Sequence, residues 1–221
     1  MIKVAIFDLD GTLTDTMDDL MTAMNGMLRE LGFPTRTKAE LLTFINNGAY
    51  RFVQLSLPEA IRDDELIMHT ALEIYSRHYS TCYAEKTYPY EGMIDALRAL
   101  KQMGIRLAVL SNKQDPFVKA IVAKLFPEDL FEEVHGQLEH PAKPDPTAAL
   151  AIAESMGVSA EECIFVGDSD VDVHTAKNAG MVSLGVSWGY RPAPYLLEVG
   201  ADLIAKIPAD IPHVFERYVR V

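Results

Sequence analysis

The stretch Phe7-Asp8-Leu9-Asp10-Gly11-Thr12 places two carboxylates two residues apart, directly after the apolar run Val4-Ala5-Ile6-Phe7. The apolar run predicts a buried strand, and residues two apart on a strand point to the same side. Asp8 and Asp10 are therefore expected to leave the strand end toward one crevice, where unpaired carboxylates repel each other. A bound cation removes that cost, so the stretch indicates a magnesium site that also holds a nucleophile. A solvated Asp-Gly turn is the alternative interpretation of this stretch alone.

The composition restricts the class of protein. The length of 221 residues is enough for one large or two small domains, and the hydrophobic fraction of 49% can supply a substantial core. The net charge of −12 argues against binding to nucleic acid or to an anionic membrane. Cys82 and Cys163 form no CxxC pattern, so a disulfide scaffold or a structural zinc site is not expected. With no signal peptide and no long apolar run, we expect a cytoplasmic protein.

The chain changes character twice. Residues 15–86 have the spaced apolar positions of helices and no convincing strand, with Thr37 and Glu40 placed as helix cap and N3 residue. From Tyr88 onward, apolar runs alternate with helix-like segments, which predicts an α/β fold with a parallel sheet. We therefore expect a core made of residues 1–14 and 87–221, with a helical insertion over 15–86. Further strands are expected over residues 105–110, 131–138, 163–166, 182–186 and 202–204.

Polar side chains follow several of these predicted strands. Ser111 and Asn112 follow the strand over 105–110, Asp168 and Asp172 follow the strand over 163–166, and Lys143 lies in a loop between prolines. Ligands of parallel sheets bind outside the carboxyl ends of the strands. The acids, the hydroxyl and the amine are therefore expected along one rim of the sheet. Each also has an ordinary explanation, as a helix cap, a solvated lysine or a solvated turn.

This residue set fits phosphoryl transfer, which depends on positioning and charge neutralisation. Magnesium prefers oxygen ligands, and Asp8, Asp168 and one main-chain carbonyl meet that demand. Lys143, Ser111 and the main-chain N–H groups beyond Asp8 would bind phosphate oxygens. Asp8 would attack phosphorus, and Asp10 would protonate the leaving group and later deprotonate water.

Four motifs occur in order along the chain, and together they resemble those of the haloacid dehalogenase-like hydrolases, in the phosphoglycolate-phosphatase-like branch. They are Asp8-Leu9-Asp10-Gly11-Thr12, Leu110-Ser111-Asn112-Lys113, Lys143-Pro144-Asp145-Pro146 and Gly167-Asp168-Ser169 with Asp172. The resemblance implies a Rossmann-like, doubly wound parallel sheet core with an inserted α-helical cap domain.

The resemblance also implies roles for individual residues. Members of the family hold Mg²⁺ with the positions matched here by Asp8, by the main-chain carbonyl of Asp10 and by Asp168, while Asp172 would orient the ligands or Lys143. In the cap, Arg51 lies where relatives contact substrate carboxylate or phosphate. The remaining phosphate- or substrate-binding candidates are Gly11, Thr12, Ser111, Asn112 and Lys143.

The expected function is a magnesium-dependent phosphatase of a small phosphorylated metabolite, acting as a monomer or homodimer without nucleic-acid or membrane partners. Phosphoglycolate is the substrate by resemblance only. A sugar phosphomutase resembling beta-phosphoglucomutase is an alternative, although that relative has a histidine where this chain has Leu20. An inorganic pyrophosphatase is a second enzymatic alternative. The non-enzymatic alternative is a receiver-like switch that is phosphorylated on aspartate.

Overall fold

The computed structural model describes residues 1–46, 48–138 and 140–219. The chain divides into two compact units, one made of residues 1–15 and 89–221 and the other of residues 16–88. The boundaries fall at the short strands β2 (Thr14–Asp15) and β3 (Tyr88–Pro89). In the described part of the chain, no helix has the length and apolar character needed to span a bilayer.

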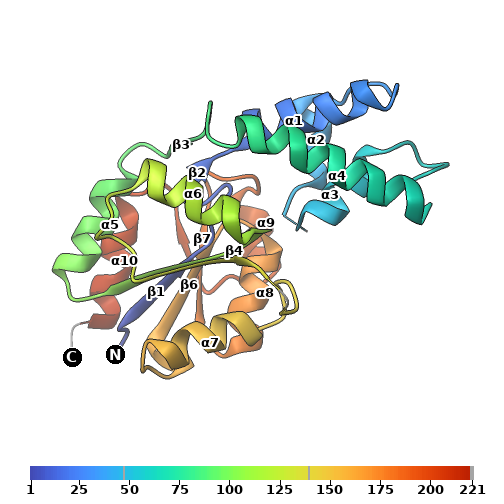
Figure 1. The fold of residues 1–221 in the computed structure, drawn as a ribbon. Helices are drawn as coiled ribbons and strands as arrows, with labels where there is room; N and C mark the ends of the chain where they lie inside the picture. The colour runs from blue at the N-terminus through green and yellow to red at the C-terminus, as the bar shows by residue number, and fades with distance from the viewer. Residues whose placement is uncertain (47, 139, 220–221) are drawn as a thin grey trace. The chain divides into compact units, whose positions relative to one another are not determined.

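The first unit is built on a parallel sheet, as the alternating pattern predicts. Its described strands form a six-stranded sheet in the order β5-β4-β1-β6-β7-β8, and each neighbouring pair is parallel (Figure 1). The central strand β1 lies between β4 and β6, so the carboxyl ends of these three strands meet at one rim. The strands are β1 (Val4–Phe7), β4 (Arg106–Gln114), β5 (Glu133–Gln137), β6 (Cys163–Gly167), β7 (Val182–Val186) and β8 (Leu203–Ala205).

Helices of the first unit cover both faces of the sheet. Helices α5 and α10 lie side by side on one face, whereas α7 and α8 lie together on the other (Figure 1). This doubly wound arrangement confirms the predicted fold class and follows from right-handed crossovers between parallel strands. The helices are α5 (Met93–Gln102), α6 (Asp115–Leu125), α7 (Thr147–Ser155), the 3₁₀ turn η1 (Ala160–Glu162), α8 (Asp170–Ala179), α9 (Ala193–Glu198) and α10 (Asp210–Val219).

The core of this unit holds the rim in place. All four residues of β1 are fully buried, because a central parallel strand is covered on both faces. On the α7 and α8 face, Val4, Ile6 and Phe165 pack with small side chains such as Ala149 and Ala176. The positions of Asp8 and Asp168, each just beyond a buried strand, are therefore fixed by packing rather than by a loop.

The second unit contains α1 (Met17–Glu30), α2 (Lys38–Phe44), α3 (Gly48–Ser56) and α4 (Glu65–Cys82), with α1 packed against α4. No strand occurs over residues 16–46 and 48–87. The predicted cap of α2 is confirmed: the Thr37 hydroxyl accepts from Glu40 N–H, and the Glu40 side chain accepts from Thr37 N–H.

The structure differs from the sequence prediction at strand β4 and near the carboxyl terminus. β4 continues to Gln114, so Ser111, Asn112 and Lys113 belong to the strand instead of following it, and Ser111 is not a helix cap. A register shift against β5 between Leu110 and Gln114 marks this irregular strand end. Helices α9 and α10 were not predicted.

Candidate active site

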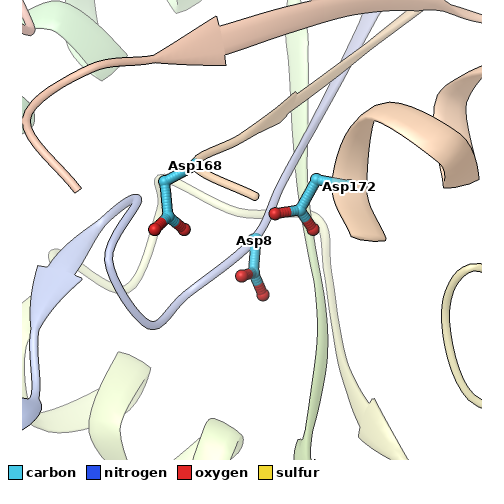
Figure 2. Close-up of side chains that lie close together, drawn as sticks. All are labelled: Asp8, Asp168 and Asp172. Carbon is cyan, nitrogen blue, oxygen red and sulfur yellow. The ribbon is translucent and has the colours of Figure 1, made fainter. Parts of the chain in front are cut away.

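Three carboxylates meet at the rim of the sheet. Asp8 follows β1, Asp168 follows β6, and Asp172 lies in the first turn of α8 (Figure 2). Each offers one oxygen, and these oxygens lie within 4.8 Å of one another. All three residues are buried. Since like charges this close are costly to bury, the group requires a nearby cation.

Lys143 supplies one positive charge to this group. Its Nζ lies 3.0 Å from Asp8 Oδ1 and 2.7 Å from Asp172 Oδ1, and its side chain is 3% exposed. Burial lowers the pKa of Lys143, but the charges of Asp172 and Asp8 outweigh burial and raise that pKa overall. Lys143 is therefore a fixed cation between two acids from different elements.

One lysine does not neutralise three acids, and their pKa values reflect this. Burial raises the pKa of Asp8 to about 6, although the charge of Lys143 acts in the opposite direction. Burial also raises the pKa of Asp168, with the charges of Asp172 and Asp8 adding to the effect. In the protein alone, the site therefore favours a further cation or bound protons.

The hydrogen bonds of the three acids separate their roles. Asp172 Oδ2 accepts from the Ser169 hydroxyl at 2.6 Å and from Ser169 N–H at 3.1 Å, while Asp172 Oδ1 faces Lys143. Asp8 Oδ1 is buried and, among the described residues, receives no well-aligned hydrogen bond, although Lys143 Nζ is close. Asp8 therefore retains an oxygen for a metal ligand bond, whereas Asp172 has both oxygens engaged.

Asp168 is held by two loops. Its Oδ1 accepts from the Thr12 hydroxyl at 3.1 Å, and its Oδ2 accepts from Tyr190 N–H at 2.7 Å. Each oxygen has a second lone pair for a cation. Oxygen-only donors, two of them carboxylates from rigid strand ends, fit Mg²⁺ better than a softer metal.

Gly11 and Thr12 shape the site through bonds within the protein. Gly11 N–H donates to the Thr14 carbonyl, and Gly11 has φ +83°, where a Cβ would lie 2.5 Å from Asp168 Oδ2. The Thr12 hydroxyl bonds to Asp168, and its N–H makes a long bond to the Leu9 carbonyl. These contacts hold Asp168 and the turn, and the phosphate-binding role of Gly11 and Thr12 stays a prediction.

The loop after β7 follows a predicted strand, so its place at the rim was expected, but its bonds to the turn at Thr12 were not. The Trp188 indole Nε1 donates to the Thr12 carbonyl at 3.0 Å, and a Cβ on Gly189 would lie 2.3 Å from the Gly11 carbonyl oxygen. The glycine pair thus permits close approach of two loops that are distant in sequence. The Trp188-Gly189-Tyr190 run after a predicted strand was the available signal.

Asp10 has an unpredicted partner in Lys113. Lys113 Nζ lies 2.6 Å from Asp10 Oδ1 and 2.5 Å from Asp10 Oδ2. The side chains are 6% and 15% exposed, respectively. The Asp10 side chain is therefore engaged in a largely buried ion pair. Lys113 belongs to the Leu110–Lys113 motif, but no local spacing in the sequence links it to Asp10.

Ser111 and Asn112 occupy different surroundings. Ser111 is buried at the rim, where its hydroxyl accepts a long bond from Lys113 N–H. The Asn112 amide bonds to both the N–H and the carbonyl of Lys143, at 2.8 and 3.0 Å. These two bonds engage the amide oxygen and nitrogen of Asn112 and position Lys143, while the phosphate-binding role of Asn112 stays a prediction.

Arg51 lies on α3 in the second unit. It is exposed, and its guanidinium donates to the Gln54 side chain at 2.5 Å. The structure brings Asp8, Asp10, Ser111, Lys143, Asp168 and Asp172 together on one unit and leaves Arg51 on the other.

Comparisons with known proteins agree with this geometry. Residues 5–186 match the model of the haloacid dehalogenase-like hydrolase family. The chain is similar to the phosphoglycolate phosphatase of Pseudomonas syringae pv. tomato, at 35% identity over 86% of this chain and 71% of the relative. It is also similar to the phosphoglycolate phosphatase of Thiobacillus denitrificans, at 32% identity over 94% of this chain and 92% of the relative.

The fold is also similar to that of a solved structure. A predicted phosphoglycolate phosphatase from Haemophilus somnus superposes with a TM-score of 0.89 at 28% identity, covering 96% of this chain and 97% of that one. The family assignment rules against the receiver-like switch and confirms that the protein is an enzyme. On the four motifs, the fold and these matches, the chain belongs to the haloacid dehalogenase-like hydrolases.

Proposed function

We propose that this enzyme is a Mg²⁺-dependent phosphatase that hydrolyses a small phosphate monoester, of which phosphoglycolate is the first candidate. The observation that carries the proposal is the state of Asp8. It is a buried carboxylate at the end of a central strand, one of its oxygens has no aligned donor among the residues that the structure describes, and Lys143 Nζ lies 3.0 Å from it. The names of the similar phosphatases support the substrate class.

The residues that would hold Mg²⁺ are Asp8 and Asp168 through their side chains, and Asp10 through its main-chain carbonyl as in the family. Asp172 would orient Lys143 instead, because both of its oxygens already accept hydrogen bonds. A bound Mg²⁺ would supply positive charge against the three acids and the phosphate group.

The reaction would proceed in two steps on residues of this chain. An Asp8 oxygen forms a bond to phosphorus, and the bond from phosphorus to the leaving oxygen breaks. The leaving oxygen keeps the electron pair of that bond and receives a proton from Asp10. Water then forms a bond to phosphorus, gives a proton to Asp10, and the phosphorus–Asp8 bond breaks. Lys143 and the Ser111 hydroxyl would contact phosphate oxygens during both steps.

We further propose that residues 16–88 act as the cap domain of this enzyme, with Arg51 contacting the substrate. Caps of this kind exclude water and select the substrate when they close. Leu20, at the position where the mutase relative has histidine, is buried on α1. It offers no polar group for a sugar, which favours the phosphatase over the mutase.

The proposal is tested by phosphate release from phosphoglycolate, pyrophosphate, a hexose phosphate and p-nitrophenyl phosphate, with Mg²⁺ or with EDTA. We expect turnover of phosphoglycolate that needs Mg²⁺ and is lost in Asp8→Asn. An exposed acid such as Asp95, in the same unit, gives a matched control as Asp95→Asn. Absence of turnover of every phosphate ester would overturn the proposal. A preference for pyrophosphate would instead identify the enzyme as an inorganic pyrophosphatase.

A further inference from the structure

The pairing of Lys113 with Asp10 places a cation on one side of the site. Lys113 Nζ contacts both Asp10 oxygens at 2.5 and 2.6 Å, and its side chain is 6% exposed. Lys143, another lysine at the rim, contacts Asp8 and Asp172 instead. Lys113 therefore contacts the proposed acid/base Asp10, whereas Lys143 contacts the proposed nucleophile Asp8.

The position of Lys113 relative to the leaving group follows from the role of Asp10. A proton passes from Asp10 to the ester oxygen only across a hydrogen bond of about 2.5–3.0 Å. Because Lys113 Nζ is equally close to both Asp10 oxygens, the ester oxygen then lies within about 6 Å of Nζ. Lys113 is consequently a cation beside the leaving group, whereas Lys143 serves the phosphate side.

A cation at this position favours a leaving group of a particular chemistry. In a phosphorylated 2-hydroxy acid, the carboxylate is attached to the carbon that carries the ester oxygen, so its oxygens can reach Nζ. A charge-assisted hydrogen bond to a carboxylate compensates a buried ammonium, whereas a neutral leaving group offers no charge. The carboxylate would share Lys113 with Asp10.

We propose that Lys113 is a specificity-determining residue that binds the carboxylate of a phosphorylated 2-hydroxy acid. The inference rests on the proposed function, since it needs Asp10 to face the leaving group. It assigns the carboxylate contact to Lys113 on the core unit instead of to Arg51 on α3. The substrate class is that of an anionic alkyl leaving group next to a phosphate ester.

The experiment compares substrates that differ only in this charge. The value of kcat/KM is measured for phosphoglycolate, for 2-hydroxyethyl phosphate, in which a neutral CH₂OH replaces the carboxylate, and for p-nitrophenyl phosphate. We expect Lys113→Met to reduce the ratio of kcat/KM for phosphoglycolate to kcat/KM for 2-hydroxyethyl phosphate by roughly ten- to hundredfold, mainly by raising KM for phosphoglycolate. Lys113→Arg should retain part of the ratio. Lys119→Met, which removes an exposed lysine paired with Asp115, should leave it unchanged.

The outcomes separate this inference from the proposed function. An equal loss on all three substrates in Lys113→Met would show that Lys113 only positions Asp10, and would overturn the inference while the phosphatase remains. Loss of the ratio in Arg51→Gln, with no change in Lys113→Met, would also overturn it. Absence of wild-type turnover on every substrate would instead remove the proposed function.

A measurement on the wild type covers the case in which Lys113→Met does not fold. With p-nitrophenyl phosphate as substrate, glycolate should inhibit competitively, whereas ethylene glycol at the same concentration should not. Equal inhibition by the two compounds, or by neither, would contradict a carboxylate site at Lys113.

Discussion

Replacing Lys143 with methionine removes a cation that lies among three buried carboxylates. Its Nζ lies 3.0 Å from Asp8 Oδ1 and 2.7 Å from Asp172 Oδ1, and these side chains are between 2% and 9% exposed. At an effective dielectric constant of about 20, opposite charges about 4 Å apart attract by about 4 kcal/mol. Removing one partner of a buried pair costs about 3–5 kcal/mol. We expect a loss of that size in the free energy of unfolding of the metal-free variant at pH 8.

The stability lost in Lys143→Met should depend on pH, and the raised pKa of Asp8 determines whether the loss grows or shrinks as pH falls. Burial raises the pKa of Asp8 from 3.8 to about 6, so the folded state binds this proton more tightly than the unfolded state. The contribution of Asp8 to stability is therefore fully present below about pH 4 and is lost as pH rises through about 6. Without Lys143 the pKa of Asp8 rises further, and the cost of Lys143→Met should shrink as pH falls from 8 toward 5.

The assay is urea unfolding in EDTA, followed by the fluorescence of Trp188, the single tryptophan of the chain. In Mg²⁺ at about a hundred times its dissociation constant, the wild type should gain about 2.7 kcal/mol. At the same Mg²⁺ concentration the variant should gain more than the wild type, because the ion replaces the lost charge. Lys119→Met breaks a pair whose lysine is 56% exposed, and should cost less than about 1 kcal/mol. A loss below about 1 kcal/mol for Lys143→Met in EDTA, or a deficit that Mg²⁺ leaves unchanged, would refute this reasoning.

Three further predictions follow from the same contacts. Asp10→Asn should accumulate phosphoprotein when given a phosphate donor and Mg²⁺, whereas Asp8→Asn should not, and equal labelling of the two variants would contradict their assigned roles. The fluorescence of Trp188 should change saturably with Mg²⁺, because its indole bonds to Thr12, whose hydroxyl bonds to the proposed metal ligand Asp168; a flat titration would contradict that link. On α1, the buried Asp19 carboxylate accepts from Lys86 N–H and from the N–H and hydroxyl of Thr87. In thermal unfolding, Asp19→Ala should therefore destabilise the second unit by about 1–3 kcal/mol per orphaned donor. Asp18→Ala, which breaks a partly exposed ion pair with Lys38, should cost less than about 1 kcal/mol.

The rim of the sheet was predictable because its residues follow apolar strands. The runs over residues 4–7 and 163–166 are buried on both faces, and this burial is visible in the sequence as unbroken hydrophobicity. Parallel pairing then brings Asp8 and Asp168 together without any knowledge of loops. Strand β5 was harder to predict because its residues are mostly half-buried at the sheet edge.

The contacts made by side chains across loops were not predictable. Lys113 reaches Asp10 across 103 residues, and Trp188 reaches Thr12 across 176, so no local spacing links the partners. The match of Asn112 to a motif likewise did not reveal that its amide bonds to the backbone of Lys143. Helix α10 was missed although its apolar residues Ile211 and Phe215 are four apart and both are buried.

The arrangement of charges explains why these contacts matter to catalysis. The proposed attack by Asp8 needs an ionised carboxylate, yet burial raises the pKa of Asp8 to about 6. Lys143 opposes that rise only because Asp172 and Asn112 fix its two ends, one at the ammonium and one at the backbone. Asp172 in turn adds a negative charge that raises the pKa of Asp8. Asp172 therefore orients Lys143 but adds one more acid to the site, and the proposed Mg²⁺ would balance this excess of negative charge.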